Sequence, residues 1–192
     1  MTTRRVLGTS AGVLGALAAI AGRPSPNAPA AIDVAAIARE IDARTDHVSA
    51  VELAEWIRDH KPGLRVLDVR SDSEFAAYHI PSAEHAPMSA LAAMRPRAGE
   101  TVVLYSEGGA HAGQAWVLLR ALGFRDVHFL AGGLLDWLDD VMRPALGTGP
   151  DAARVAALSR YFGGTPRAAG AALDGPNDDA HTAVARMRRR GC

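Results

Sequence analysis

Short apolar runs alternate with segments of helical periodicity through the middle of the chain. Strand-length apolar runs occupy residues 64–69, 102–105 and 127–130, and Val48 marks a shorter strand. Apolar positions at helical spacing predict helices between and after these runs, at residues 51–57, 73–77, 91–94, 113–122 and 133–139. Strands that alternate with helices in this way predict an α/β fold, with a buried parallel sheet and helices on both faces.

Two flanking regions continue the pattern outside this central domain, which we place at residues 47–143. Residues 23–46 begin with a linker that carries three prolines in seven residues. A short amphipathic helix over 32–41 follows, with Asp33 near its start, and we expect it to pack outside the domain.

Residues 144–192 form a C-terminal extension that we expect to be helical and ordered in part. A helix over 151–161 would turn Val155 and Leu158 inward. Residues 162–179 are rich in Gly, Pro and Asp and predict a loose segment. A second helix over 182–190 would carry the arginines of a basic tail.

Composition narrows the classes of function. The chain has 192 residues and a formal net charge of zero, from 21 basic and 21 acidic residues, so no overall field favours nucleic acid. Its single cysteine, Cys192, excludes a disulfide within the chain and a four-cysteine zinc site. The seven histidines show no recognised ligand spacing. We therefore expect no metal and no cofactor.

The N-terminal segment, residues 1–22, has the pattern of a bacterial export signal. Arg4 and Arg5 precede a charge-free apolar stretch over 6–20, and an A-x-A cleavage site follows at 19–21. The paired arginines resemble the twin-arginine signal, which predicts a periplasmic or exported protein. The alternative is an uncleaved anchor that would associate the protein with the inner membrane. Its 15 apolar residues fall short of the ~20 that span a bilayer.

The candidate site follows the strand at 102–105. There the chain passes through a glycine loop, Ser106, Glu107, Gly108, Gly109, Ala110 and His111, into the start of a helix. Such a junction directs several backbone N–H groups and a helix N-terminus at one point. The pattern predicts an anion-binding pocket.

Five segments together resemble the rhodanese sulfurtransferases. Besides the loop at 106–111, the motifs are LDVR at 67–70, EF at 74–75, HIP at 79–81 and a double glycine followed by Trp137 at 132–137. Tyr78 and Ser82 stand where glycines usually flank the third of these. The resemblance covers residues 47–140 and implies a rhodanese-like parallel sheet flanked by helices.

The resemblance also implies that a cysteine should open the loop and an arginine should close it. Here Ser106 and His111 occupy those positions. A serine hydroxyl is far less acidic than a thiol and forms no persulfide, and the Glu107 carboxylate opposes thiosulfate. We therefore expect no thiosulfate sulfurtransfer at the loop. Hydrolysis by Ser106, with His111 as base and Glu107 as its orienting group, is an alternative that requires these side chains to converge.

The remaining motif residues have mainly structural explanations. Asp68 and Arg70 are expected to support the site by tying loops together through charge-assisted hydrogen bonds. His79 is expected to be a hydrogen-bonding residue of a turn, and Trp137 a core residue. Gly132 and Gly133 predict a tight turn with an unusual φ.

The basic tail offers the second candidate chemistry. Cys192 follows arginines at 188–190, and neighbouring arginines lower a thiol pKa. Our leading hypothesis is a rhodanese-homology module without sulfurtransferase activity, a pseudoenzyme, that binds an anion or a protein partner through residues 106–111. The alternative is a sulfurtransferase, sulfur carrier or redox protein that acts through Cys192. A third hypothesis is a structural module with an idle loop, so the sequence leaves open whether the protein is an enzyme.

Overall fold

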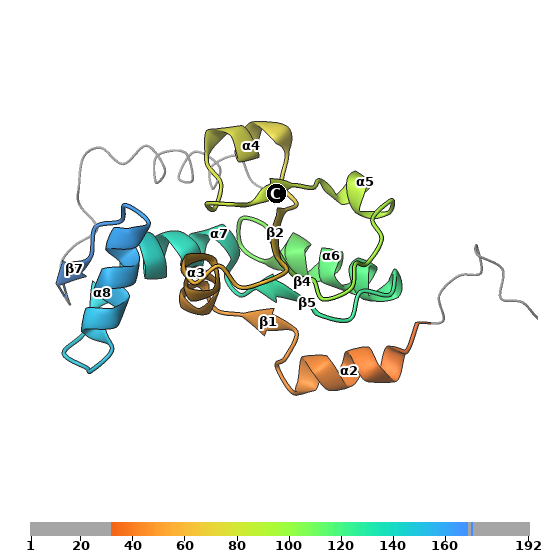
Figure 1. Ribbon diagram of the computed structural model, residues 1–192, viewed down its shortest axis with the longest axis horizontal. Coiled ribbons are helices and arrows are strands. Elements are labelled where there is room, and N and C mark those ends of the chain that lie inside the picture. Colours follow the sequence, from red (N-terminus) through yellow and green to blue (C-terminus); the bar gives the residue numbers. More distant parts are fainter. Residues whose placement is uncertain (1–31, 169, 171–192) are drawn as a thin grey trace, which may run out of the picture. The chain divides into compact units, whose positions relative to one another are not determined.

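The computed structural model describes residues 32–168 and residue 170 (Figure 1). Its helices are α2 (Val34–Asp42), α3 (Ala50–Arg58), α4 (Asp72–Ala77), α5 (Met88–Leu91), α6 (Ala110–Ala121), α7 (Gly133–Asp136), the π-helix η1 (Trp137–Met142) and α8 (Ala152–Tyr161). Its strands are β1 (His47–Val48), β2 (Leu64–Asp68), β3 (Glu84–His85), β4 (Thr101–Tyr105), β5 (Val127–Leu130), β6 (Ala145–Leu146) and β7 (Arg167–Ala168).

A five-stranded parallel sheet forms the centre, in the order β1-β5-β4-β2-β3. Helices lie on both of its faces, which confirms the predicted α/β fold. The chain moves outward from β2 to β3 and outward in the other direction from β4 to β5. The order of the strands therefore reverses between β2 and β4, whose last residues, Asp68 and Tyr105, are paired. In open α/β sheets this is the place where ligands bind, beyond the carboxyl ends of the strands.

The central strands are apolar along their length because both faces of the sheet are buried. Val103 and Tyr105 face one core cluster, which α3, α7, η1 and α8 complete. Val102 and Leu104 face the other cluster, formed mainly with α5 and α6. Side chains that alternate between two cores explain why β4 reads as an uninterrupted apolar run.

Helix α6 begins three residues earlier than the sequence predicts, at Ala110 and not at residue 113. Gly109 has φ 91° and turns the chain directly out of the loop into the helix. The Gly113 N–H then donates to the Gly109 carbonyl oxygen at 2.9 Å, so Gly113 lies within the first turns of the helix. The end of the loop therefore belongs to the helix N-terminus.

The C-terminal region agrees with the sequence in one part and differs in another. Helix α8 is confirmed, with Leu158 in the first core cluster and Val155 half-buried. The expectation of a loose segment over 162–179 is wrong for β7, which pairs in parallel with β6. The Thr165 N–H donates to the Met142 carbonyl oxygen and so guides the chain back towards β6.

Helix α2 lies at the edge of the domain. The Asp33 side chain caps it by accepting from the Ala36 N–H, and Ile37 packs against the second core cluster. Among the described residues, no helix is long and apolar enough to cross a membrane. Four features predicted from the sequence lie outside the described residues: the export segment, the proline-rich linker, the helix at 182–190 and the thiol of Cys192.

Candidate functional site

The loop at 106–111 folds around the hydroxyl group of its first residue. Ser106 follows the last residue of β4 and is 2% exposed. Its Oγ accepts hydrogen bonds from the Gly109 N–H at 3.1 Å and from the Ala112 N–H at 3.3 Å. The group that begins the loop therefore lies where two backbone donors and the N-terminus of α6 converge.

A second glycine turn holds the loop from behind. The Leu134 N–H donates to the Ser106 carbonyl oxygen at 2.9 Å, and the Leu135 N–H donates to that of Glu107 at 3.1 Å. Gly133 has φ 62°, and a Cβ there would lie 2.4 Å from the Ser106 oxygen. The double glycine thus serves the unusual φ expected of it and also permits this close approach of two backbones.

Four further backbone donors of the loop remain available. Within residues 32–168 and 170, no group accepts a hydrogen bond from the N–H of Glu107, Gly108, Ala110 or His111. Ala110 and His111 are the first residues of α6, where N–H groups have no partner inside the helix. The loop therefore offers donors to an acceptor from outside.

The charged side chains of the loop have different surroundings. Glu107 is half-buried, and its Oε1 is buried without a hydrogen-bond partner among the described residues. His111 is exposed, and its charge acts on Glu74 of α4. Burial opposes ionisation of Glu74, but hydrogen bonds from Ser71, with help from Arg70 and His111, lower its pKa. Glu107 thus adds a carboxylate to the loop, and the charge of His111 acts on a second carboxylate, that of Glu74.

The structure does not bring together the groups that hydrolysis would require. Among the described residues, Ser106 Oγ is hydrogen-bonded only to the two backbone N–H groups, and no bond joins it to His111. Among the described residues, Glu107 makes no hydrogen bond to His111 either. A serine nucleophile needs a base within hydrogen-bond reach, so this geometry gives the hydrolase hypothesis no support.

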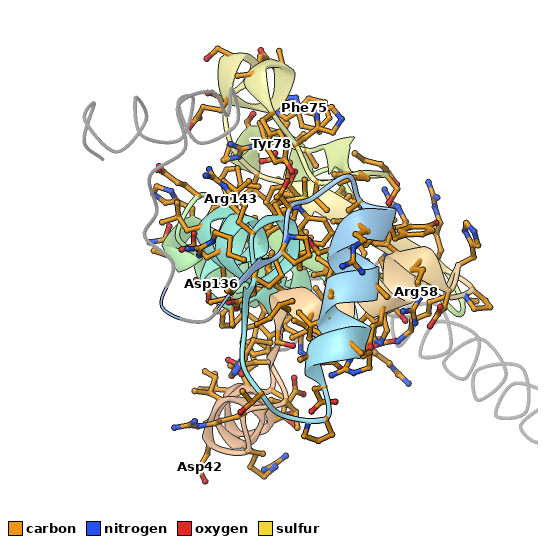
Figure 2. All side chains as sticks on the ribbon, turned by 90° about the vertical axis from the view of Figure 1, so that its left-hand side faces the viewer. Asp42, Arg58, Phe75, Tyr78, Asp136 and Arg143 are labelled. Atoms are coloured by element: carbon orange, nitrogen blue, oxygen red, sulfur yellow. The ribbon has the colours of Figure 1, made fainter. Side chains whose placement is uncertain are left out.

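A buried ion pair lies at the end of the neighbouring strand, β2. Arg70 Nη2 lies 2.6 Å from Asp68 Oδ2, and Arg70 Nε lies 3.0 Å from Asp68 Oδ1. Arg70 Nη2 also donates to the Tyr78 carbonyl oxygen at 2.7 Å. The pair thus ties the end of β2 to the segment after α4. Figure 2 shows Tyr78 beside Phe75 of α4, at the opposite end of the domain from Asp42 of α2.

Tyr105 and Trp137 extend this support below the loop. The Tyr105 hydroxyl accepts from the Ile80 N–H at 3.1 Å, and burial raises its pKa well above the ordinary value. Trp137 is fully buried, and its Nε1 donates to the Tyr78 hydroxyl at 3.2 Å. Trp137 is therefore a core residue, as the sequence predicts, and it also holds Tyr78 in place.

The histidines of this region are used in packing and hydrogen bonding. His79 Nδ1 lies 3.0 Å from the Phe75 carbonyl oxygen, and the two rings stack at 4.1 Å. His85 approaches the same ring at 5.0 Å, and its Nε2 lies 2.8 Å from the Arg70 carbonyl oxygen. No group of three or more potential metal ligands occurs in the described part of the chain.

Sequence reasoning missed two features of the site. The charge of His111 acts on Glu74 although the two residues are 37 positions apart, and only the place of Glu74 after the LDVR motif could have signalled this. The close approach of Gly133 to the loop backbone was missed as well. The repeated glycine was its only sequence signal.

Comparisons with known proteins found similar sequences and structures. The family model described as the rhodanese-like domain matches residues 49–140. The uncharacterized protein slr1261 of Synechocystis is 39% identical over 74 residues, which are 38% of this chain and 41% of that protein. The probable adenylyltransferase/sulfurtransferase MoeZ of Mycobacterium tuberculosis is 30% identical over 100 residues, 50% of this chain and 25% of that protein. This chain thus spans less than half the length of either relative.

Solved structures include similar proteins. The human single-domain sulfurtransferase TSTD1 is 29% identical, with a TM-score of 0.45, over 48% of this chain and 95% of that one. The Alr3790 protein of Anabaena is also 29% identical, with a TM-score of 0.44, over 47% of this chain and 74% of that one.

Proposed function

Because the chain contains a rhodanese-like domain, related to the sulfurtransferases, over residues 49–140, we propose that this domain is a binding module that does not transfer sulfur at Ser106. In this proposal the loop at 106–111 receives a small anion or an acidic group of a protein partner. The observation that carries the proposal is the loop itself, which keeps its backbone donors around a hydroxyl group where the resemblance implies a thiol.

The backbone donors support binding. The N–H groups of Glu107, Gly108, Ala110 and His111 have no acceptor within the described residues. Two of them belong to the N-terminus of α6, a helix of 12 residues whose dipole favours negative charge at that end. An acceptor placed there would gain several hydrogen bonds without any change in the protein.

The chemistry of Ser106 supports the absence of sulfur transfer. A sulfurtransferase nucleophile attacks the outer sulfur of thiosulfate, breaks the sulfur–sulfur bond, releases sulfite and keeps the transferred sulfur as a persulfide. The attacking group must be a thiolate, and the free cysteine pKa of about 8.5 makes this accessible near neutral pH. A serine hydroxyl is almost fully protonated there, and it accepts two hydrogen bonds that occupy its lone pairs.

Glu107 limits the class of ligand. Its carboxylate lies in the loop, and its buried Oε1 lacks a hydrogen-bond donor in the described part of the chain. A second negative charge nearby would repel it, most strongly if that charge were double, as in thiosulfate. A singly charged carboxylate, such as a partner's Asp, Glu or chain terminus, fits the loop better than thiosulfate does.

Sulfurtransfer from thiosulfate to cyanide tests the catalytic half of the proposal. We expect background rates for the wild type and for Cys192→Ser. Turnover by the wild type that survives the loss of Cys192 would contradict the proposal. Turnover that disappears in Cys192→Ser, together with a one-sulfur mass increase on Cys192, would favour the alternative of a carrier thiol.

Ser106→Cys provides the matched gain-of-function control. The two N–H donors and the helix N-terminus should lower the pKa of the new thiol below about 8.5, whereas Glu107 should raise it. The thiol pKa can be measured from the pH dependence of alkylation by iodoacetamide. We expect the double variant Ser106→Cys/Glu107→Gln to have the lower pKa and the higher sulfurtransfer rate of the two.

Amide chemical shifts test the binding half. Addition of sodium acetate to the full chain should shift the amide signals of residues 107, 108, 110 and 111 in a saturable manner. Glu107→Gln should bind acetate more tightly because it removes the opposing charge. Shifts that fail to saturate, or an unchanged affinity in Glu107→Gln, would contradict binding at the loop.

We also propose export of the protein, on the basis of its N-terminal sequence alone. Arg4 and Arg5 precede the apolar stretch at 6–20, and a cleavage site follows at 19–21. Fractionation of cells that express the full chain, followed by N-terminal sequencing, distinguishes a cleaved periplasmic form from a membrane-anchored one. Cytoplasmic protein with an intact N-terminus would contradict both.

A further inference from the structure

A second concave site lies at the amino ends of strands β4 and β5, at the opposite end of β4 from the loop at 106–111. Two turns, one before β4 and one between α6 and β5, line a half-open cavity of about 420 Å³. The lining residues are Pro96, Arg97, Ala98, Gly99, Glu100, Gly123, Phe124, Arg125 and Asp126. We call this cavity the amino-edge pocket. The five residues of β4 separate it from Ser106, a distance of about 16 Å at the usual rise of a strand.

The two carboxylates that line the amino-edge pocket, Glu100 and Asp126, already accept hydrogen bonds from the protein. Glu100 accepts from Arg65 Nη1 at 3.2 Å and from the Arg97 N–H. Asp126 accepts from Thr101 Oγ1 at 2.6 Å and lies 2.9 Å from His128 Nε2. Both carboxylates are therefore held by the protein, and their negative charge is partly balanced.

Two guanidinium groups of the same pocket remain available. Arg97 and Arg125 are exposed, and neither guanidinium has a hydrogen-bond partner among residues 32–168. The acidic group that faces Arg97 from β3, Glu84, already binds Arg65 through two hydrogen bonds of 3.0 and 2.8 Å. The unused hydrogen-bonding capacity of the side chains that line the pocket thus consists mainly of cationic donors.

The backbone of the pocket is fixed independently of these arginines. Arg120 Nη1 donates to the carbonyl oxygens of Phe124 and Arg125, at 2.7 and 2.9 Å, and Arg120 Nη2 pairs with Glu40 of α2. The Thr101 N–H donates to the Gly63 carbonyl oxygen at 3.0 Å beside the other turn. Both turns therefore hold their shape without help from a ligand.

We propose that the amino-edge pocket binds a small organic anion. Its phosphate or carboxylate would lie between the guanidinium groups of Arg97 and Arg125, which bind such groups in bidentate fashion. Its apolar part would lie against Pro96 and Ala98, which are both exposed. The volume of the pocket is in the range of small-molecule sites, and an anion satisfies the donors that the protein leaves unused.

Titration of the full chain with phenyl phosphate tests this proposal, with amide chemical shifts as the readout. We expect saturable shifts for residues 97–100 and 123–126. Arg97→Ala and Arg125→Ala should each weaken binding by about tenfold, as expected for the loss of one charge-assisted contact. Arg160→Ala, which removes an exposed arginine of α8, should leave the affinity unchanged. Phenol, which lacks the charge, should produce no saturable shift.

The titration can contradict the proposed amino-edge site without contradicting the proposed anion site at the loop. Saturable shifts confined to residues 107–111 would overturn the amino-edge pocket and leave the proposed function intact. Binding by the double variant Arg97→Ala/Arg125→Ala with wild-type affinity, or equal weakening by Arg160→Ala, would also overturn it. Circular dichroism of each variant verifies that the fold is retained, because neither arginine is part of the core.

Discussion

The two ends of strand β4 present hydrogen-bond donors of different kinds. At the carboxyl end, the donors are backbone N–H groups of the loop at 106–111, placed by Gly109 and Gly133. At the amino end, they are the side chains of Arg97 and Arg125. The backbone N–H groups cannot be removed without disturbing the fold. The arginine side chains can be removed by substitution. Binding and stability should therefore be coupled at the loop and separable at the amino-edge pocket.

The contacts that hold the loop do not depend on a thiol at its first position. The geometry of the loop depends on backbone contacts, namely the bonds from Leu134 and Leu135 to the carbonyl oxygens of Ser106 and Glu107. None of these contacts requires a thiol. A change from cysteine to serine at the first position would alter the chemistry and leave the donors in place.

The largest expected effect on the free energy of unfolding comes from the ion pair between Asp68 and Arg70, near the carboxyl end of β4. Asp68→Asn removes the negative charge that faces the buried Arg70 guanidinium, while the arginine stays desolvated. Loss of one partner of a buried ion pair costs about 3–5 kcal/mol. We expect the free energy of unfolding, from urea denaturation at pH 7, to fall by about that amount.

The double variant Asp68→Asn/Arg70→Met is the control for this prediction. It removes both charges, so it should lose less stability than the sum of the two single variants. A loss of under 1 kcal/mol in Asp68→Asn would mean that the pair contributes little to the carboxyl end.

The second prediction concerns the glycine that holds the loop. In Gly133→Ala, the new Cβ would lie 2.4 Å from the carbonyl oxygen of Ser106 and 2.5 Å from that of Glu107. The residue would also keep a φ of 62°. Overpacking and left-handed strain together should cost about 3 kcal/mol in the free energy of unfolding. Acetate binding at the loop should weaken with it.

Gly123→Ala provides the matched comparison at the amino end. Gly123 also has a positive φ, 93°, but a Cβ there meets nothing within 4 Å. Only the strain remains, which we expect to cost about 1 kcal/mol. Equal losses in Gly133→Ala and Gly123→Ala would show that the backbone contact behind the loop is unimportant.

The sequence predicts the fold well where burial determines the pattern. Strands β2, β4 and β5 are buried on both faces and read as apolar runs, so their positions follow from periodicity. The strands β3, β6 and β7 each have two residues and are held by backbone pairing, which no side-chain pattern encodes. Such short pairs depend on contacts between segments that are distant in the sequence.

The candidate site is predictable in its backbone and much less so in its side chains. Glycines after an apolar strand indicated the loop and its N–H donors. The influence of His111 on Glu74 depends on α4, and the loop backbone depends on the turn at 132–133, both distant in the sequence. The amino-edge pocket was missed because its arginines are separated by 28 positions and belong to turns without a motif.

A smaller, pH-dependent effect is expected at Asp126. Partial burial favours its neutral form, but hydrogen bonds from Thr101 and His128 outweigh burial and lower its pKa in the folded state. This contribution to stability is therefore present above the ordinary pKa of about 3.9 and is lost as the pH falls through the lowered value. Asp126→Asn should cost about 0.5 kcal/mol at pH 7, because the side chain is 53% exposed.

Urea denaturation as a function of pH measures this effect. The gap between the wild type and Asp126→Asn should close as the pH falls through the lowered pKa of Asp126, where the wild-type carboxylate becomes protonated. Thr101→Val removes a donor and keeps the carboxylate, so it should weaken the pH dependence too. A gap that widens as the pH falls would have the wrong sign for a lowered pKa.

The smallest expected effect would separate the two ends of β4 most clearly. In Arg97→Ala/Arg125→Ala, the free energy of unfolding should change by under about 0.5 kcal/mol, because both side chains are exposed and make no hydrogen bond within the described residues. The same variant should lose phenyl phosphate binding. Urea denaturation and the titration, performed on one sample, measure both quantities. A loss of stability as large as that of Gly133→Ala would make the arginines part of the fold, and the two ends of the strand would then no longer differ in kind.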